Sequence, residues 1–293
     1  MFTGSIVALV TPFKKNMQVN EERLRFLINW HIKNKTDAIL VCGTTGESAT
    51  LTHDEHKRVI KVAVEEAKGK IPIIAGAGSN STQEALDLAE FARRVKANAI
   101  LVITPYYNKP TQEGLYWHYK KIAIQVKLPL IIYNVPSRTG INIFPETVVR
   151  LYKECKSIIG IKEASGNLDQ ITKLMSLVDR KFLLLSGSDE LTLPIMSVGG
   201  KGVISVLANI MPKETHSLVE SFLKGNLEKA KKLQLELYPL IKALFIETNP
   251  IPVKTALGAM GLIDPILRLP LCKMRKENEE KLINILKNYN LIS

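Results

Sequence analysis

Hydrophobic residues along the chain gather into eight short runs that are rich in Ile, Leu and Val and show no sustained alternation with polar residues. Runs of this kind are typical of parallel strands whose two faces are both covered. The predicted strands are Ser5–Val10, Ala38–Val41, Ile71–Ala75, Ala99–Ile103, Leu130–Tyr133, Ile158–Ile161, Phe182–Leu185 and Gly202–Val206.

Amphipathic segments with helical spacing lie between these runs, for example residues 20–34, 52–69 and 82–96. In the second of them Thr52 and Glu55 have the spacing of a capping box, which predicts the start of the helix. Gly69 is well placed to end it.

Eight strand–helix units in about 220 residues favour a (β/α)8 barrel, the TIM-barrel fold of the α/β class. A doubly wound sheet is the alternative, but the GxGxxG dinucleotide fingerprint is missing after the first strand. The chain beyond Gly225 holds helical patterns at 226–246 and 276–289 and no convincing strand. We therefore expect a catalytic barrel at 1–224 and an all-helical C-terminal domain at 225–293.

The composition and net charge of the chain limit the classes of function that are expected. The chain of 293 residues is 46% hydrophobic and 23% charged, which is ordinary for a globular protein, and its formal net charge is +12. The basic residues are scattered over helix-like segments and form no stripe interleaved with aromatics, so nucleic-acid binding is not expected. The positive field mildly favours anionic ligands.

The cysteines and the lengths of the apolar runs indicate the cellular compartment in which the protein is expected. Cys42, Cys155 and Cys272 are far apart and form no CxxC pair, which predicts reduced thiols and neither a zinc site nor a disulfide framework. The N-terminal apolar stretch is too short for a signal or membrane segment. We expect a cytoplasmic protein that does not bind a membrane.

Polar and aromatic residues concentrate after the predicted strands, where a barrel enzyme has its active site. They include the segments GTTGES (43–48), TPYYN (104–108), NVPSRTG (134–140) and SGSDE (186–190), together with Lys162 and Glu163. This distribution is the one expected of an enzyme barrel.

Lys162 is the most unusual of these residues, because it follows the apolar run Ile158–Ile161. It is either a lysine that extends to solvent or a nucleophile for Schiff-base formation. Burial disfavours the charged form of an amine, and imine formation requires the neutral form. If Ile158, Gly160 and Lys162 face inward, the amine points into the barrel mouth, with room beside it at the glycine.

The neighbouring segments also allow two interpretations each. The GTTGE turn is either a simple connection or a set of N–H and hydroxyl groups for a small carboxylate. Tyr133 either packs or relays protons near Lys162. Arg138 is either solvated or a bidentate ligand for a second carboxylate. Tyr106 and Tyr107 are adjacent, so their rings cannot both serve one pocket.

His53 and His56 form an HxxH pattern at helical spacing, which could be half of a metal site. No third ligand is evident in the sequence, so the residues themselves favour a solvated first turn of a helix and no metal.

Several motifs together resemble a known family. The segments GTTGES, TPYYNKPTQEGLYWHY, YNVPSRTG, GIKEASGN and NPIPVK are similar to the dihydrodipicolinate synthase (4-hydroxy-tetrahydrodipicolinate synthase) family over essentially the whole chain. GTTGE alone is shared with the wider pyruvate-dependent aldolases, including N-acetylneuraminate lyases. The arginine of VPSRTG is more specific to the synthases. Ser165 and Ser188 stand where threonine and aspartate are common.

The resemblance implies a lyase of lysine and diaminopimelate biosynthesis that condenses pyruvate with L-aspartate 4-semialdehyde and needs no metal or organic cofactor. Lys162 would form the imine, and Thr44, Tyr133 and Tyr107 would relay protons, with Tyr107 reaching in from a neighbouring subunit. The substrate-binding residues would be Thr44, Thr45, Arg138, Gly187 and Ile204.

The resemblance also implies regulation and assembly. Regulated members bind L-lysine at a subunit interface, and feedback inhibition by L-lysine is expected here. The family further suggests a homotetramer built as a dimer of dimers. The residues at the matching effector positions are Ser48, Ala49, His53, His56, Asn80, Glu84 and Tyr106.

Overall fold

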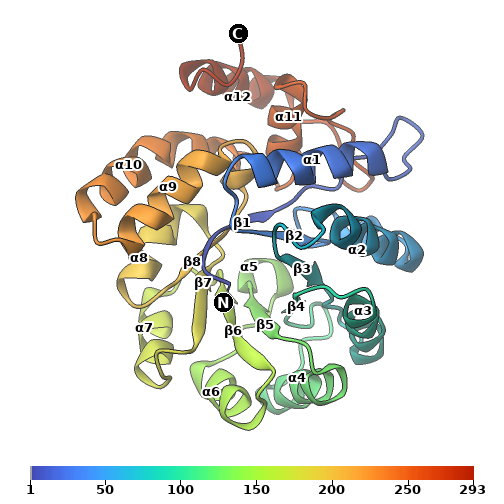
Figure 1. Cartoon of the computed structure of the whole chain (residues 1–293), viewed down its shortest axis with the longest axis vertical. Coiled ribbons are helices and arrows are strands. Elements are labelled where there is room, and N and C mark those ends of the chain that lie inside the picture. Colours follow the sequence, from blue (N-terminus) through green and yellow to red (C-terminus); the bar gives the residue numbers. More distant parts are fainter. Residues whose placement is uncertain (1) are drawn as a thin grey trace.

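The computed structural model describes residues 2–293 and has a closed barrel of eight parallel strands at its centre (Figure 1). The strands pair in chain order, and β1 also pairs with β8. The predicted (β/α)8 barrel is confirmed. The strands are β1 (Gly4–Ala8), β2 (Ala38–Val41), β3 (Ile73–Gly76), β4 (Ala99–Ile103), β5 (Leu130–Asn134), β6 (Ile158–Glu163), β7 (Leu183–Ser186) and β8 (Gly202–Ser205).

Helices surround the barrel and continue beyond it. The helices after β1 to β4 are α1 (Glu21–Lys33), α2 (His53–Ala67), α3 (Thr82–Arg94) and α4 (Gln112–Val126). Those that follow, up to the one after β8, are α5 (Pro136–Thr139), α6 (Pro145–Glu154), α7 (Leu168–Ser176), α8 (Thr192–Ser197) and α9 (Pro212–Leu223). The last three are α10 (Leu227–Ala243), α11 (Ile251–Ala259) and α12 (Lys276–Asn288). Short 3₁₀ turns are η1 (Ser48–Thr50), η2 (Asp189–Leu191) and η3 (Leu207–Asn209).

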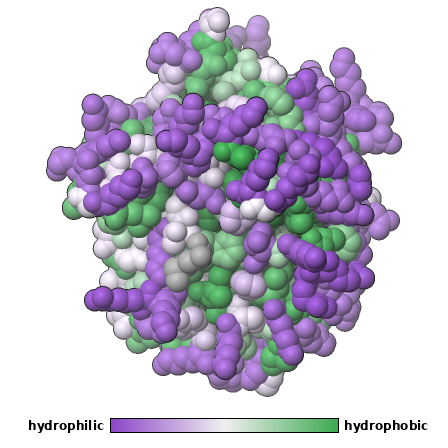
Figure 2. Space-filling view, viewed as in Figure 1, coloured by the Kyte–Doolittle hydropathy of each residue, from purple (hydrophilic) through white to green (hydrophobic). Residues whose placement is uncertain are grey.

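The helical signals in the sequence have direct structural counterparts. Thr52 and Glu55 form the predicted capping box, because each side chain accepts a hydrogen bond from the other residue's backbone N–H. Helices follow the barrel as predicted, and the boundary proposed at 224 falls between α9 and α10. The division into two domains stays a prediction. Hydrophilic side chains cover much of the face shown in Figure 2. Within residues 2–293 no helix is long and apolar enough to span a membrane.

Side chains of the barrel strands fill two separate cores. Outward residues such as Leu130, Ile132 and Ile161 pack in the large core between the strands and helices. Inward residues such as Ile131 and Tyr133 pack with Leu40, Leu185 and Ile204 inside the barrel. This double burial is the physical reason why the strands have continuous apolar runs.

The expected inward set on β6 is wrong at Ile158 and right at Gly160 and Lys162, but the room expected beside Gly160 is absent. The pairing of β5 with β6 passes from Leu130↔Ile158 to Ile131↔Gly160, so a bulge skips Ile159 and changes the alternation. Ile158 therefore packs in the outer core, and Ile159 contacts the inner one. At Gly160 a Cβ atom would lie 1.9 Å from the carbonyl oxygen of Leu183, so this glycine permits close strand packing and leaves no room for a ligand.

Buried histidines, among them His31 and His118, make stability depend on pH. His31 is fully buried, and its Nδ1 lies 2.8 Å from Thr36 Oγ1. Burial lowers the pKa of His31 to about 3 and that of His118 to about 4. In both rings Nε2 has no hydrogen-bond partner among the described residues. Each ring is therefore neutral in the folded protein at pH 7.

We predict that the free energy of unfolding falls as the pH drops from 7 to 5. The unfolded chain takes up protons at histidine near pH 6.5 while the native rings stay neutral, which costs about 2 kcal/mol per histidine at pH 5. His31→Asn keeps a polar atom near Thr36 without a titrating ring, so its loss between pH 7 and 5 should be smaller. Urea unfolding at both pH values measures this, and an unchanged pH dependence in the variant would contradict it.

Candidate active site

A cavity of about 230 Å³ lies at the carboxyl ends of the barrel strands. It brings together most of the residues that the sequence singled out as catalytic or substrate-binding. Its lining consists of Ala8, Leu40, Gly43, Thr44, Thr45, Leu101, Tyr133, Val135, Ser137, Arg138, Lys162, Ala164, Gly187, Ser188, Glu190, Val206, Phe245 and Asn249.

Lys162 does not extend to solvent. It lies within β6, which runs two residues further than predicted, and only 6% of the residue is exposed. It pairs in register with Tyr133 on β5 and Leu185 on β7, and its Nζ lies 4.1 Å from the centre of the Tyr133 ring. Within residues 2–293 its amine has no hydrogen bond or ion pair. A buried amine without a carboxylate partner is available for chemistry.

Gly187 keeps the space beside Lys162 open. A Cβ atom at this position would lie 3.1 Å from Lys162 Cε and 2.7 Å from the Cβ of Ala164. A side chain here would clash with Ala164 and press on the Lys162 side chain, so the sequence needs a glycine directly after β7.

A buried polar cluster fixes the strand ends that carry Tyr133 and Lys162. The next residues in register are Asn134 and Glu163, and Asn134 Nδ2 donates to the Glu163 carboxylate at 3.1 and 3.2 Å. The N–H of Ser165 donates to the same carboxylate at 2.7 Å. Burial raises the pKa of Glu163 above its usual value. The cluster holds β5 and β6 together directly behind the two cavity residues.

A buried ion pair holds the GTTGES turn against α11. Glu47 has a left-handed backbone with φ 52°, and its Oε1 lies 2.6 Å from Lys254 Nζ in α11. Both side chains are fully buried. Lys254 also donates to the Thr11 carbonyl at 2.9 Å, and the N–H of Arg268 donates to Glu47 Oε2 at 3.2 Å. Burial lowers the pKa of Lys254 to about 8.

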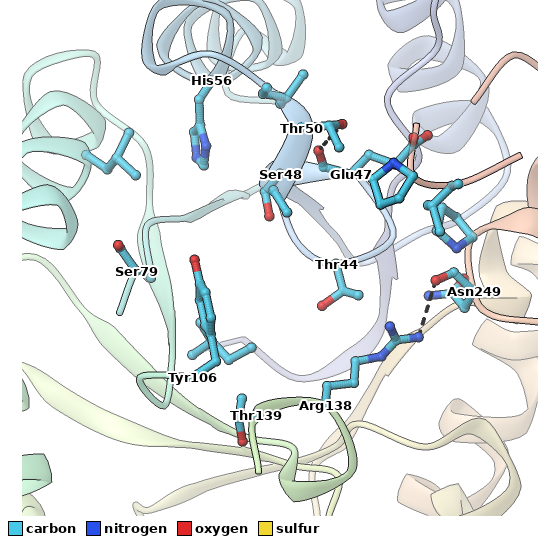
Figure 3. A pocket seen from close by; sticks show the side chains of 18 of the residues that line it. Thr44, Glu47, Ser48, Thr50, His56, Ser79, Tyr106, Arg138, Thr139 and Asn249 are labelled. Atoms are coloured by element: carbon cyan, nitrogen blue, oxygen red, sulfur yellow. Dashed lines mark hydrogen bonds between the residues drawn. The ribbon is translucent and has the colours of Figure 1, made fainter. Parts of the chain in front are cut away.

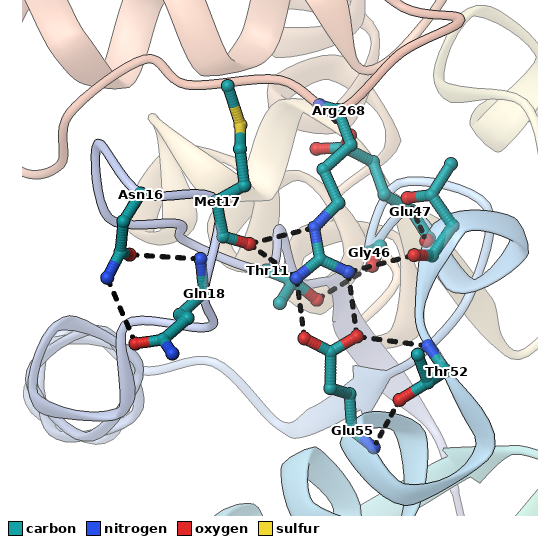
Figure 4. Close-up of polar contacts among 10 residues, drawn as sticks. Thr11, Asn16, Met17, Gln18, Gly46, Glu47, Thr52, Glu55 and Arg268 are labelled. Atoms are coloured by element: carbon teal, nitrogen blue, oxygen red, sulfur yellow. Dashed lines mark hydrogen bonds and ion pairs between the residues drawn. The ribbon is translucent and has the colours of Figure 1, made fainter.

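Arg268 ties the same turn to α2 and to the N-terminal loop. Its guanidinium binds both oxygens of Glu55 at 2.6 and 2.7 Å and donates to the carbonyl groups of Met17 and Thr50 (Figure 4). This pair lowers the pKa of Glu55 to about 2.

Asn249 is a cavity residue that sequence reasoning did not single out, although it begins the NPIPVK motif. Its Nδ2 donates to Thr45 Oγ1 at 3.0 Å. Its backbone carbonyl accepts from Arg138 Nη2 at 3.2 Å (Figure 3). Asn249 thus orients two predicted substrate-binding residues that are 93 positions apart in the chain.

A second cavity, of about 430 Å³, adjoins the first and shares Thr44, Arg138 and Asn249 with it (Figure 3). It contains six of the seven residues at the expected effector positions: Ser48, Ala49, His53, His56, Glu84 and Tyr106. Asn80, the seventh, is absent from its lining and uses its carbonyl to accept from Asn108 Nδ2 at 2.9 Å.

The expectation of a solvated first turn is right for His53 and wrong for His56. The side chain of His53 is 57% exposed, and its Nε2 lies 4.0 Å from Glu84 Oε1. His56 is buried, its Nε2 lies 2.7 Å from the Gly76 carbonyl, and burial lowers its pKa to about 4. The ring is therefore neutral at pH 7, so Nε2 carries the proton and donates to that carbonyl.

Two predicted residues lie outside the smaller cavity. Tyr107 is 89% exposed, with φ 72°, and lines neither cavity. Its neighbour Tyr106 lines the larger one, so the two rings do point to different places. Ile204 is 1% exposed and packs inside the barrel with Leu185.

A closed (β/α)8 barrel with a lysine amine in a small cavity at the carboxyl ends of its strands defines a class of enzyme, the Schiff-base-forming lyases. Within that class, the chain belongs to the dihydrodipicolinate synthetase family, whose model matches residues 1–289.

Individual relatives agree with this assignment. The 4-hydroxy-tetrahydrodipicolinate synthase of Syntrophus aciditrophicus is 53% identical over 292 residues and covers 100% of both chains. The crystal structure of the chloride-inhibited dihydrodipicolinate synthase from Acinetobacter baumannii, in complex with pyruvate, superposes with a TM-score of 0.97 at 46% identity and full coverage of both chains. The enzyme from Cyanidioschyzon merolae with lysine bound gives 0.96 at 40% identity, with 99% of each chain covered.

We predict that Lys254→Met lowers the free energy of unfolding by about 3–5 kcal/mol, because it leaves the buried Glu47 carboxylate unpaired. Adding Glu47→Gln should recover part of that loss, and urea unfolding of the single and double variants measures both effects. The matched control is Lys276→Met, whose partner Glu280 lies 4.0 Å away in an exposed pair. A loss in Lys254→Met no larger than in the control would contradict the prediction.

Proposed function

We propose that the protein is a 4-hydroxy-tetrahydrodipicolinate synthase that condenses pyruvate with L-aspartate 4-semialdehyde in lysine and diaminopimelate biosynthesis. The observation that carries the proposal is the buried, unpaired amine of Lys162 in a cavity with Tyr133 and Arg138. The family and the pyruvate complex of the Acinetobacter relative support it. The wide spacing of the cysteines suits a cytoplasmic enzyme.

The reaction begins when the neutral amine of Lys162 attacks the keto carbon of pyruvate and water leaves, which forms an imine. Loss of a proton from the pyruvate methyl group gives an enamine, whose carbon then attacks the aldehyde of the second substrate. The amino group of that substrate finally adds to the imine carbon and releases Lys162, which closes a six-membered ring. No metal or organic cofactor takes part in these steps.

The proton transfers are assigned to Tyr133, Thr44 and Tyr107. Tyr133 and Thr44 line the cavity, and the Tyr133 ring already lies against Lys162. Tyr107 is almost fully exposed in the single chain, so its role requires a neighbouring subunit. We therefore propose a homo-oligomer, a tetramer arranged as a dimer of dimers, in which Tyr107 completes the partner's site.

Substrate binding is assigned to groups around Lys162. Thr44 and Thr45 offer hydroxyl and N–H donors for the pyruvate carboxylate, and Asn249 supports the Thr45 hydroxyl. Arg138, which also lines the cavity, would bind the carboxylate of the semialdehyde. Gly187 provides space beside the lysine, and Ile204 would support the pyruvate pocket from inside the barrel.

Another pyruvate aldolase, such as an N-acetylneuraminate lyase, is the second candidate, because GTTGE is common to both. Arg138 in the cavity favours the synthase, since its guanidinium can bind the carboxylate of the semialdehyde with two hydrogen bonds. Comparing turnover of the semialdehyde with that of sialic acid separates the two. A barrel without catalysis is disfavoured by the intact set of lysine, tyrosine and threonine residues.

We predict that borohydride reduction in the presence of pyruvate attaches the pyruvate skeleton to Lys162. Reduction traps the imine as a stable secondary amine, so peptide mass mapping locates the modified residue. Lys162→Arg should show no adduct, and the buried Lys254 should stay unmodified in both proteins. An adduct at another lysine, or none in the unaltered enzyme, would overturn the mechanism.

We also propose that L-lysine inhibits the enzyme by binding in the larger cavity. Glu84 lines it as an acceptor for an ammonium group, and it is held by Ser79 Oγ at 2.7 Å. The neutral ring of His56 presents its second nitrogen as an additional polar group. The lysine-bound structure of the Cyanidioschyzon relative supports this effector.

We predict that Glu84→Ala and His56→Ala each weaken this inhibition. For Glu84→Ala the lysine concentration for half-inhibition should rise about tenfold or more, because a charge-assisted hydrogen bond is worth about 1.5–3 kcal/mol. For each variant, the rate in the presence of L-lysine is compared with the rate of the same variant without L-lysine. Glu90→Ala, an exposed site on the same helix, is the control. Unchanged inhibition in both variants would exclude this binding site.

A further inference from the structure

The charged residues that line the smaller cavity are two cations, Lys162 and Arg138, and one carboxylate, Glu190. Glu190 lies in η2, directly after β7, and is half-buried. Within the described part of the chain its carboxylate has no ion pair or hydrogen bond. The cavity therefore contains an acidic group that the condensation chemistry described above does not use.

The adjacent acid shows what a purely structural carboxylate does in the same turn. Asp189 is 5% exposed, and its Oδ2 accepts the backbone N–H groups of Val206 at 2.9 Å and Leu207 at 3.1 Å. Asp189 thereby fixes η2 to the end of β8. Because this contact already orders the turn, Glu190 is not needed to hold the turn in place. Its side chain lines the cavity instead.

Barrel topology places Glu190 and Arg138 on opposite sides of the reactive lysine. Lys162 is on β6, whose neighbours in the closed sheet are β5 and β7. Arg138 is in α5, immediately after β5, and Glu190 follows β7. A molecule joined to Lys162 is consequently flanked by a guanidinium on one side and by a carboxylate on the other, within a cavity of about 230 Å³.

We propose that Glu190 binds the α-ammonium group of the second substrate and thereby selects an α-amino-acid aldehyde over an aldehyde without the amine. The inference rests on the function proposed above, in which Arg138 binds the carboxylate of the same molecule. The second substrate carries an ammonium and a carboxylate, and Glu190 and Arg138, which line the same cavity of about 230 Å³, offer each of these groups a partner of opposite charge. The remaining polar lining is neutral, with hydroxyl and amide groups such as those of Thr44, Ser188 and Asn249, and a charge-assisted bond is stronger than a neutral one.

A different interpretation assigns Glu190 to the positive end of the short helix α8, which begins two residues later. Under that interpretation, removing its charge changes stability slightly and leaves substrate selection unaffected. The two interpretations therefore predict different kinetic results for one isosteric substitution.

The experiment is steady-state kinetics of Glu190→Gln with the semialdehyde, together with inhibition by 4-oxobutanoate, which has the same chain and carboxylate but no amine. The KM for the semialdehyde should rise about tenfold to a hundredfold, the usual effect of losing a bond to a charged group. The inhibition constant of 4-oxobutanoate should stay within about twofold. Glu190→Asp, which keeps the charge, should recover part of the affinity.

Two controls separate this inference from the proposed function. Borohydride trapping with pyruvate alone should modify Lys162 equally in Glu190→Gln and in the unaltered enzyme. Glu214→Gln, a half-buried acid in the first turn of α9 and outside the cavity, should leave the KM unchanged.

The outcomes are distinct. An unchanged KM for the semialdehyde, or an equal loss of affinity for 4-oxobutanoate, would overturn the role of Glu190. Altered imine formation with pyruvate would do so too, because the charge would then act on Lys162. No imine in the unaltered enzyme would instead overturn the proposed reaction, and the inference with it.

Discussion

The buried ion pair between Glu47 and Lys254 fixes the turn after β2 beside the smaller cavity. Removing two charges from water costs several kcal/mol per ion, so such a pair persists only with close contact and further hydrogen bonds. Here the 2.6 Å contact is completed by the Thr11 carbonyl and the Arg268 N–H. Glu47 ends the turn that carries Thr44 and Thr45, so the position of this turn depends on α11.

The C-terminal helices therefore do more than cover one side of the barrel. Asn249 and Lys254 belong to one short segment, and they contact the turn after β2 at two points, Thr45 and Glu47. The proposed division at residue 224 would place Lys162 in one domain and the residues that orient the side chains around it in the other. A stable arrangement of the cavity then requires both parts to be folded together.

Sequence patterns were sufficient where a local rule applies. Eight apolar runs predicted the strands, and the polar residues after them predicted the end at which the cavity lies, because parallel strands share their carboxyl edge. The β6 bulge was not predictable, since it depends on how Ile158 and Gly160 pair with β5. The contact of Lys254 with Glu47 spans 207 positions, and no local pattern indicates it. The burial of His56 depends on the Gly76 carbonyl of a neighbouring strand.

The shared wall of the two cavities has a thermodynamic consequence. Thr44, Arg138 and Asn249 line both, so a ligand in either cavity contacts side chains that also face the other. If one ligand changes the preferred position of any of them, it changes the affinity of the second ligand, and the effect must be equal in both directions. Coupling between the cavities thus needs no long chain of contacts through the barrel. Arg138 is the most direct route, because its guanidinium lines both cavities and donates to the backbone carbonyl of Asn249, which also lines both.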